Sequence, residues 1–139
     1  GRYMADDVLL NKADTIEKGV RRINEIFDGN PENLLVDKTK QDAILLNIER
    51  ACQASIDMAM RMIKLKKLGL PKESREAFDL LLAANLIDQD LCRKMHGLVG
   101  FRNTAIHNYI KLDLKIVESI VITRLGDFKL LSKTLLKVT

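Results

Sequence analysis

The sequence predicts an all-α protein, an antiparallel up-and-down helical bundle of four to five helices. Apolar residues recur at spacings of three and four over long stretches, as in helices with one buried face. No segment follows the two-residue period of a strand over more than a few residues. Both prolines lie in short breaks, Gly29-Asn30-Pro31 and Gly69-Leu70-Pro71, which separate the helical stretches.

The length of 139 residues suits one domain, expected over residues 4–139. Gly1-Arg2-Tyr3 is expected to be a tag remnant in front of a native start at Met4. With 47% hydrophobic and 30% charged residues, the composition is that of a globular protein and excludes a disordered one. The net charge of +4 permits an anionic partner without requiring one. No signal peptide or apolar run of transmembrane length is present, so no membrane partner and a cytoplasmic location are expected.

The first two helices are expected at about 5–28 and 37–68. In the first, Leu9, Ile16 and Ile23 belong to a single apolar stripe that ends at the Gly29 break. In the second, Asp37 is the expected N-cap, and a broad apolar stripe predicts contacts with several neighbours.

Three more helical segments complete the bundle. Ser74 is the expected N-cap of a short helix over about 75–86, and Asp88 is the expected N-cap of the next. Gly97 and Gly100 weaken that fourth segment, so a bend or break is expected there. The last helix is expected to run unbroken over about 113–137, with Arg124 interrupting its stripe.

The two cysteines, Cys52 and Cys92, each lie in an apolar helical pattern. They are expected to be free buried thiols in a reducing compartment. The sequence shows no CxxC pair, no Cys/His metal spacing and no carboxylate cluster suited to a divalent ion. No metal site and no cofactor are therefore expected.

The segment 101–109 is the candidate active site, because it holds Arg102, His107 and Tyr109 within eight positions. On a regular helix Arg102 and Tyr109 share a face, whereas His107 lies ~140° around the axis from Arg102. A neutral imidazole is a general base near pH 7, and a guanidinium binds phosphate oxygens. The alternative is a polar helical patch beside a partly buried tyrosine.

Histidine and arginine without a metal suit one reaction in particular. The base takes the proton of an RNA 2′-hydroxyl, whose oxygen attacks the adjacent phosphorus while the arginine stabilises the added charge. DNA lacks this hydroxyl, so DNA is not expected as a substrate. The leaving oxygen needs an acid, and a homodimer with two copies of the segment would supply a second histidine. His96 lies roughly 16 Å from His107 along a helix, too far for the same phosphate, and is expected to be a surface or structural residue.

The segment Arg102-Asn103-Thr104-Ala105-Ile106-His107-Asn108-Tyr109 resembles the R-x4-H-x-Y motif of the HEPN superfamily of helical nucleases. Within that superfamily, the chain from Met4 to its C-terminus resembles the HepT toxin family. The turn at Leu68-Gly69-Leu70-Pro71 and the position of the motif after Leu98-Val99-Gly100-Phe101 add to the resemblance.

The resemblance implies a HEPN-like fold and a toxin endoribonuclease that acts on RNA as a dimer without a metal. It implies that Arg102 and His107 are catalytic and that Asn103 occupies an auxiliary position. It also implies that Tyr109 receives AMP from a nucleotidyltransferase antitoxin of the MntA type, which silences the toxin. Two alternatives remain open: a non-catalytic helical module that binds a nucleotide or a nucleotidyltransferase, and a purely structural bundle.

Overall fold

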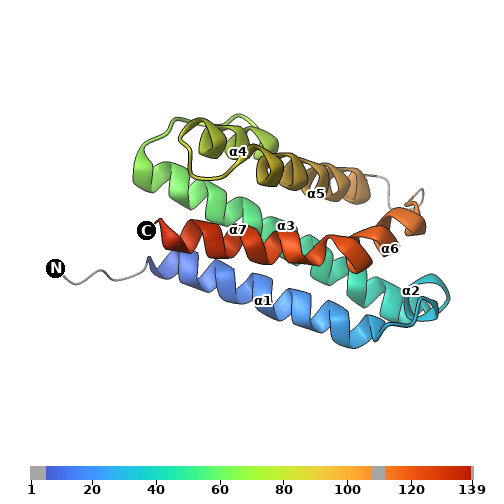
Figure 1. Ribbon diagram of the computed structural model, residues 1–139. Helices are drawn as coiled ribbons and strands as arrows, with labels where there is room; N and C mark the ends of the chain where they lie inside the picture. Colours follow the sequence, from blue (N-terminus) through green and yellow to red (C-terminus); the bar gives the residue numbers. More distant parts are fainter. Residues whose placement is uncertain (1–5, 108–111, 139) are drawn as a thin grey trace.

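The computed structural model describes residues 6–107 and 112–138, with the side chains of residues 106 and 107 outside the description. This part of the chain is all-helical, which confirms the predicted fold class (Figure 1). It has seven helices rather than four to five, because the single turn α2 was not predicted and the last helix is divided. They are α1 (Asp7–Phe27), α2 (Glu32–Leu35), α3 (Lys38–Lys66), α4 (Ser74–Ala83), α5 (Gln89–His107), α6 (Leu114–Thr123) and α7 (Leu125–Lys137).

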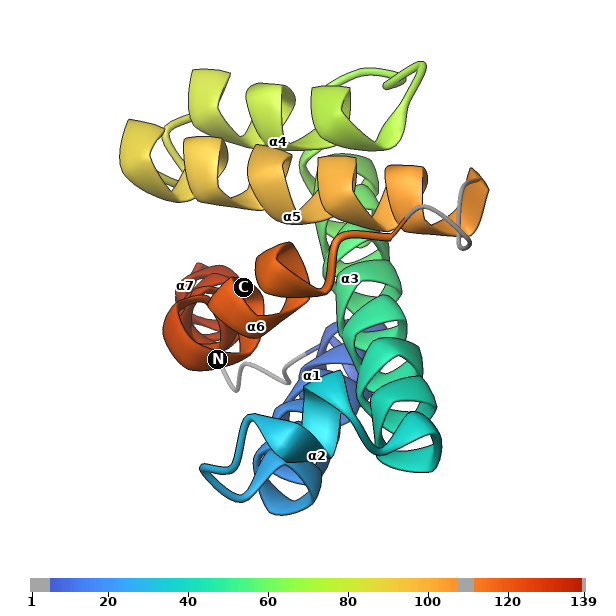
Figure 2. The same cartoon turned by 90° about the vertical axis from the view of Figure 1, so that its right-hand side faces the viewer.

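Helices α1, α3 and α7 pack together as the body of the bundle, and α1 against α3 is its most extensive helix contact. The helices α4 and α5 form a hairpin that lies across α3 (Figure 2). The single turn α2 is tied to α3 because the Gln41 side chain donates to the Leu34 carbonyl at 3.0 Å. Helix α5 therefore has α3 on one side and α4 on another, and this position determines what its polar residues can contact.

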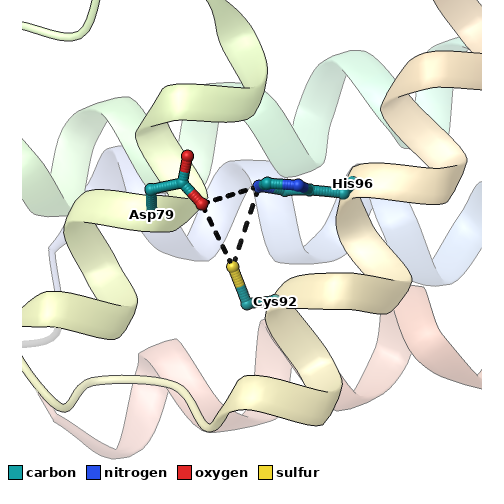
Figure 3. Close-up of side chains that lie close together, drawn as sticks. All are labelled: Asp79, Cys92 and His96. Atoms are coloured by element: carbon teal, nitrogen blue, oxygen red, sulfur yellow. Dashed lines mark hydrogen bonds and ion pairs between the residues drawn. The ribbon is translucent and has the colours of Figure 1, made fainter.

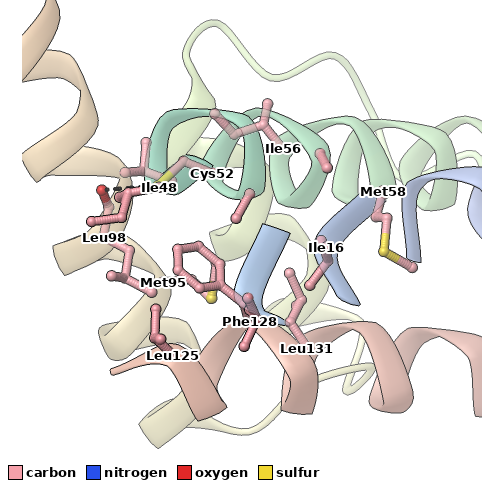
Figure 4. Close-up of a cluster of buried hydrophobic side chains, with 14 of the residues drawn as sticks. Ile16, Ile48, Cys52, Ile56, Met58, Met95, Leu98, Leu125, Phe128 and Leu131 are labelled. Carbon is pink, nitrogen blue, oxygen red and sulfur yellow. Dashed lines mark hydrogen bonds between the residues drawn. The ribbon is translucent and has the colours of Figure 1, made fainter. Parts of the chain in front are cut away.

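The core lies between these helices and draws on all the predicted stripes (Figure 4). Ile16 of α1, Met58 of α3 and Phe128 of α7 are fully or almost fully buried. Met95 and Leu98 carry the same core into α5. Burying such side chains contributes about 1.5–3 kcal/mol each relative to leaving them exposed, so this face fixes α5 against the bundle.

Aspartate caps begin the helices where the sequence predicts them. The carboxylates of Asp37, Asp88 and Asp113 accept backbone N–H bonds at 3.0, 2.8 and 2.9 Å. Such a cap stabilises a helix by about 1 kcal/mol because it satisfies a donor that has no partner inside the helix. The predicted starts of α3, α5 and α6 are confirmed.

The predicted third helix is wrong at both ends. Ser74 is the first residue of α4 rather than its cap, and Glu73 holds the cap position without a side-chain hydrogen bond. The helix ends at Ala83 because Asn85 adopts a left-handed conformation, φ 61°. Asparagine tolerates this region better than most residues, which explains an end without glycine.

Two expectations about helix continuity also fail. Helix α5 continues through Gly97 and Gly100 without a break. The buried neighbours Leu98 and Val99 offset the penalty of about 1 kcal/mol that each glycine brings. The last helix, in contrast, divides at Arg124, where φ is −116°. On a regular helix Arg124 would fall within the apolar stripe. At the break its side chain is exposed, 3.7 Å from Asp127, while Val121 and Leu125 on either side stay buried.

Within residues 6–107 and 112–138, none of the helices is both long enough and apolar enough to cross a membrane.

Candidate active site

Arg102 lies in the last two turns of α5 and is half-buried. The buried Leu98 and Val99, one turn earlier, hold this part of the helix on the core. The guanidinium Nη2 donates to Oε1 of Gln53 on α3 at 2.6 Å. The position of the guanidinium is thus set by a neutral side-chain amide from a different helix.

Gln53 is in turn held by charged residues. Its Nε2 donates to Oδ1 of Asp57 at 2.9 Å, and Asp57 pairs with Nζ of Lys12 on α1 at 3.2 Å. This chain of contacts runs from α5 through α3 to α1. Because the oxygen and the nitrogen of the Gln53 amide both have a hydrogen-bond partner, the side chain has little freedom to rotate. Gln53 therefore holds Arg102 in a fixed position.

The charge of Arg102 has no carboxylate partner among the residues that the structure describes. Its Nε is buried and makes no hydrogen bond within the same residues. A guanidinium carries five N–H donors, and Gln53 accepts from only one of its nitrogens. The arrangement leaves both charge and donors for an anion such as phosphate.

A hollow of about 410 Å³ lies beside Arg102, between α3 and α5. Its wall is mostly apolar and also includes two carboxylates. The lining residues are Asp42, Leu45, Leu46, Ile48, Glu49, Phe101, Arg102 and Ala105. The guanidinium therefore stands at the edge of an apolar depression, a common composition for a surface that another molecule covers.

The other predicted site residues are only partly within the described structure. Asn103 follows Arg102 on α5 and is half-buried. The backbone of His107 forms the end of α5, about 7.5 Å along the axis from Arg102, while its side chain lies outside the description. Tyr109 lies outside the described residues. The structure thus brings Arg102, Asn103 and the backbone of His107 to one end of a helix.

Cys52 of α3 is fully buried against Leu98 of α5 (Figure 4). Its Sγ donates to the Leu98 carbonyl at 3.6 Å. Burial raises the pKa of Cys52 to about 12, and the nearby charge of Arg102 offsets only part of that effect. The thiol is protonated at neutral pH and therefore serves packing rather than nucleophilic chemistry. The prediction that Cys52 and Cys92 are free buried cysteines is confirmed.

His96 lies on the first half of α5 and contacts α4 rather than the Arg102 site. Its Nε2 is 2.9 Å from Oδ1 of Asp79 on α4, and its side chain is 34% exposed. It lies about 16 Å before His107 along the helix and takes no part in the Arg102 site.

Gln53 is the site residue that sequence reasoning missed. The available signal was weak: Gln53 and Asp57 form a polar pair one turn apart within a helix of mostly apolar residues. Nothing in that pair indicates Arg102, which is 49 positions further along the chain.

The fold and the motif place the chain among known helical proteins. Residues 16–135 match the HepT-like family, described as Ribonuclease HepT-like. The mRNA nuclease HepT of Shewanella oneidensis is 39% identical over 124 residues, which are 89% of this chain and 92% of that protein.

Solved structures show the same fold. One is described as the tri-AMPylated Shewanella oneidensis HEPN toxin in complex with MNT antitoxin; its TM-score is 0.90 at 36% identity, over 96% of this chain and 99% of that chain. Another, described as a toxin–antitoxin with AMP-PNP, has a TM-score of 0.88 at 36% identity, over 94% of this chain and 98% of that chain. The helical bundle is therefore of the HEPN type. More narrowly, the chain belongs to the HepT-like ribonuclease family.

Proposed function

We propose that this chain is the toxin endoribonuclease of a toxin–antitoxin pair and cleaves RNA in the cytoplasm as a homodimer of single-domain subunits. Arg102 carries the proposal, because a half-buried guanidinium held by a neutral amide is suited to binding a phosphate. The family membership and the name of the 39% identical relative, an mRNA nuclease, support RNA as the substrate.

The proposed reaction needs one base, one acid and one cation. His107 accepts the proton of the ribose 2′-hydroxyl, and the oxygen forms a bond to the neighbouring phosphorus. The bond from phosphorus to the 5′-oxygen breaks, and that oxygen receives a proton. Arg102 stabilises the negative charge on the phosphoryl oxygens, and Asn103 assists at an auxiliary position. The products are a 2′,3′-cyclic phosphate and a 5′-hydroxyl, and no metal ion is required.

The acid for the leaving oxygen is the reason to propose a dimer. One chain supplies one His107, whereas two chains related by a two-fold axis supply a pair. The mostly apolar hollow beside Arg102 and the 44% exposed Leu46 in its wall support burial of this face against a second copy. A mixture of inactive His107→Ala and Arg102→Ala chains tests whether residues from both subunits serve one phosphate.

The direct test is cleavage of RNA by the purified protein in EDTA, with DNA of the same sequence as control. We expect RNA fragments with cyclic phosphate ends and intact DNA. RNA that survives an excess of dimer would refute nuclease action on that substrate and favour the alternative, a non-catalytic module that binds a nucleotide or a nucleotidyltransferase. Calorimetry with ATP and with the partner protein would then separate that alternative from a purely structural bundle.

Silencing by a nucleotidyltransferase antitoxin of the MntA type is the second part of the proposal. One of the similar solved structures contains an AMPylated toxin in complex with an MNT antitoxin, which supports the same partner here. The seven-residue spacing would place Tyr109 and Arg102 on one face of a regular helix. AMP attached to Tyr109 would then carry a phosphate towards Arg102 and compete with RNA for the guanidinium.

Tyr109→Phe separates modification from cleavage. A neutral phenol is a poor base at pH 7, so this variant should keep most of its cleavage rate. With the antitoxin, ATP and Mg²⁺, the parental protein should lose activity and gain the mass of one or more AMP groups, whereas Tyr109→Phe should stay active. Adenylate found only on another residue by mass spectrometry, or a silenced Tyr109→Phe, would defeat this part of the proposal.

A further inference from the structure

Three side chains with different donor atoms meet between α4 and α5 (Figure 3). Nε2 of His96 is 2.9 Å from Oδ1 of Asp79. Sγ of Cys92 is 3.6 Å from that same carboxylate oxygen and 3.8 Å from the same ring nitrogen. One oxygen, one nitrogen and one sulfur thus form a triangle, with the donor atoms within 4.8 Å of one another.

The size of this triangle is that of one face of a zinc coordination tetrahedron. Zinc binds oxygen and nitrogen at about 2.0–2.2 Å and sulfur at about 2.3 Å, so tetrahedral angles place the ligand atoms on the order of 3.3–3.6 Å apart. The sulfur distances of 3.6 and 3.8 Å fit this spacing. The nitrogen and oxygen, at 2.9 Å, need to separate by only a few tenths of an ångström.

The fold brings the triangle together from two helices. Cys92 and His96 are one turn apart on α5, so both side chains point towards α4. Asp79 lies on the facing side of α4. Cys92 is only 4% exposed, whereas the side chains of His96 and Asp79 are 34% and 56% exposed. The group therefore has a buried floor and an open outer side.

The open side leads into a surface hollow of about 530 Å³. Its wall includes both Cys92 and His96, and its remaining lining residues are Leu82, Gln89, Asp90 and Arg93. A fourth ligand, such as water, can approach from this hollow. Three protein ligands with an open fourth position is a common arrangement for bound zinc.

We propose that Asp79, Cys92 and His96 form a binding site for a divalent transition-metal ion, with zinc as the ion that best suits the donors. A thiolate and an imidazole favour zinc over magnesium or calcium, which prefer oxygen ligands. Binding forms one metal–sulfur bond and releases the thiol proton of Cys92 to solvent. The ion would join α4 to α5 and stabilise the helix that carries Arg102.

This site is separate from the proposed RNA-cleaving site. Arg102 lies six residues beyond His96, which is about 9 Å along α5 and roughly a third of a turn around it. Its guanidinium contacts α3, whereas the metal ligands face α4. The inference goes beyond the nuclease proposal, and either one can fail without the other.

Cobalt(II) provides the direct test, because a bound thiolate gives a sulfur-to-cobalt absorption band in the near ultraviolet. The full chain is freed of metals with a chelator, kept reduced, and titrated with cobalt chloride. We expect a band that saturates at one ion per subunit and disappears when zinc chloride is added. The sequence provides matched controls, since it contains two cysteines and two histidines. Cys92→Ser and His96→Gln should lose the band, whereas Cys52→Ser and His107→Gln should keep it.

Thermal unfolding with and without zinc chloride is the second measurement. At a zinc concentration ~100 times the Kd, the midpoint Tm should rise by about 5–10 °C. Asp79→Asn should lose most of this rise, whereas Asp14→Asn, an acid in an exposed ion pair on α1, should keep it. Circular dichroism confirms that each variant is folded, and Asp79→Asn keeps the test decisive if Cys92→Ser does not fold. No cobalt band in the reduced protein, or a band that persists without Cys92, would overturn the proposal.

Discussion

In the first half of α5, His96 pairs with the carboxylate of Asp79. In the second half, Arg102 is held by the neutral amide of Gln53, and no described carboxylate pairs with it. Both halves are anchored by buried residues of one apolar face, such as Met95 and Val99. The difference therefore lies in the partner that the facing helix offers: an acid on α4, an amide on α3.

The two partners suit the two polar residues of α5 to different ligands. A base that already contacts an acid and a thiol forms a compact donor cluster, suited to a cation. A guanidinium that contacts only an amide keeps its charge for an anion. One helix can thus present a cation site and an anion site separated by about 9 Å along its axis, because different neighbours face its two halves.

The largest effect is expected from removing the anion site. Arg102→Ala and His107→Ala should each reduce RNA cleavage by about 10²- to 10⁴-fold, because each removes charge stabilisation or proton transfer from the transition state. Initial rates on a fluorescent RNA measure this loss, with circular dichroism and light scattering to confirm fold and dimer. Cleavage at the parental rate by either variant would show that its residue is not catalytic.

A smaller effect on RNA cleavage is expected when Arg102 is given a carboxylate partner, as His96 has in the first half of α5. Gln53→Glu places a carboxylate beside Arg102 and should lower kcat/KM on the order of 10-fold, because it competes with the RNA phosphate for the guanidinium.

Gln53→Met is the matched control for this change. It removes the hydrogen bond without adding charge, so we expect a loss of only about threefold, from poorer positioning of Arg102. If Gln53→Glu and Gln53→Met lose kcat/KM equally, the neutral charge of Gln53 is not important for cleavage. Gln53 would then serve only to position Arg102.

The smallest expected effect is on thermal stability and concerns the start of α5, where Asp90 contacts Lys94 and Arg93. The hydrogen bond from Lys94, and then that from Arg93, lowers the pKa of Asp90. A lowered pKa in the folded state means that the stabilisation is present above the unfolded pKa of about 4 and is lost as pH falls through the folded pKa.

Asp90→Asn should therefore lower Tm slightly at pH 7 and leave it unchanged near pH 2. Differential scanning calorimetry across this range measures the effect, with exposed Asp14→Asn as a comparison. A difference between parental protein and Asp90→Asn that grows towards low pH would contradict this assignment.

The sequence by itself determined where α3, α5 and α6 begin and which faces the long helices bury. The caps at Asp37, Asp88 and Asp113 and the apolar stripes depend on neighbours within about four residues, so they can be deduced from local spacing. The candidate motif from Arg102 to Tyr109 was likewise visible as a short pattern on one segment. Its role in cleavage stays a prediction.

Only the tertiary structure decided which helices supply the partners of these residues. Arg102 meets Gln53 across 49 positions, and Asp79 meets Cys92 across 13. The break at Arg124 also belongs here, because the apolar spacing of three and four continues through this position and predicts one unbroken helix. Contacts of this kind depend on the rotation and axial position of one packed helix against another. These follow from the fit of many side chains at once, which no local pattern in the sequence encodes.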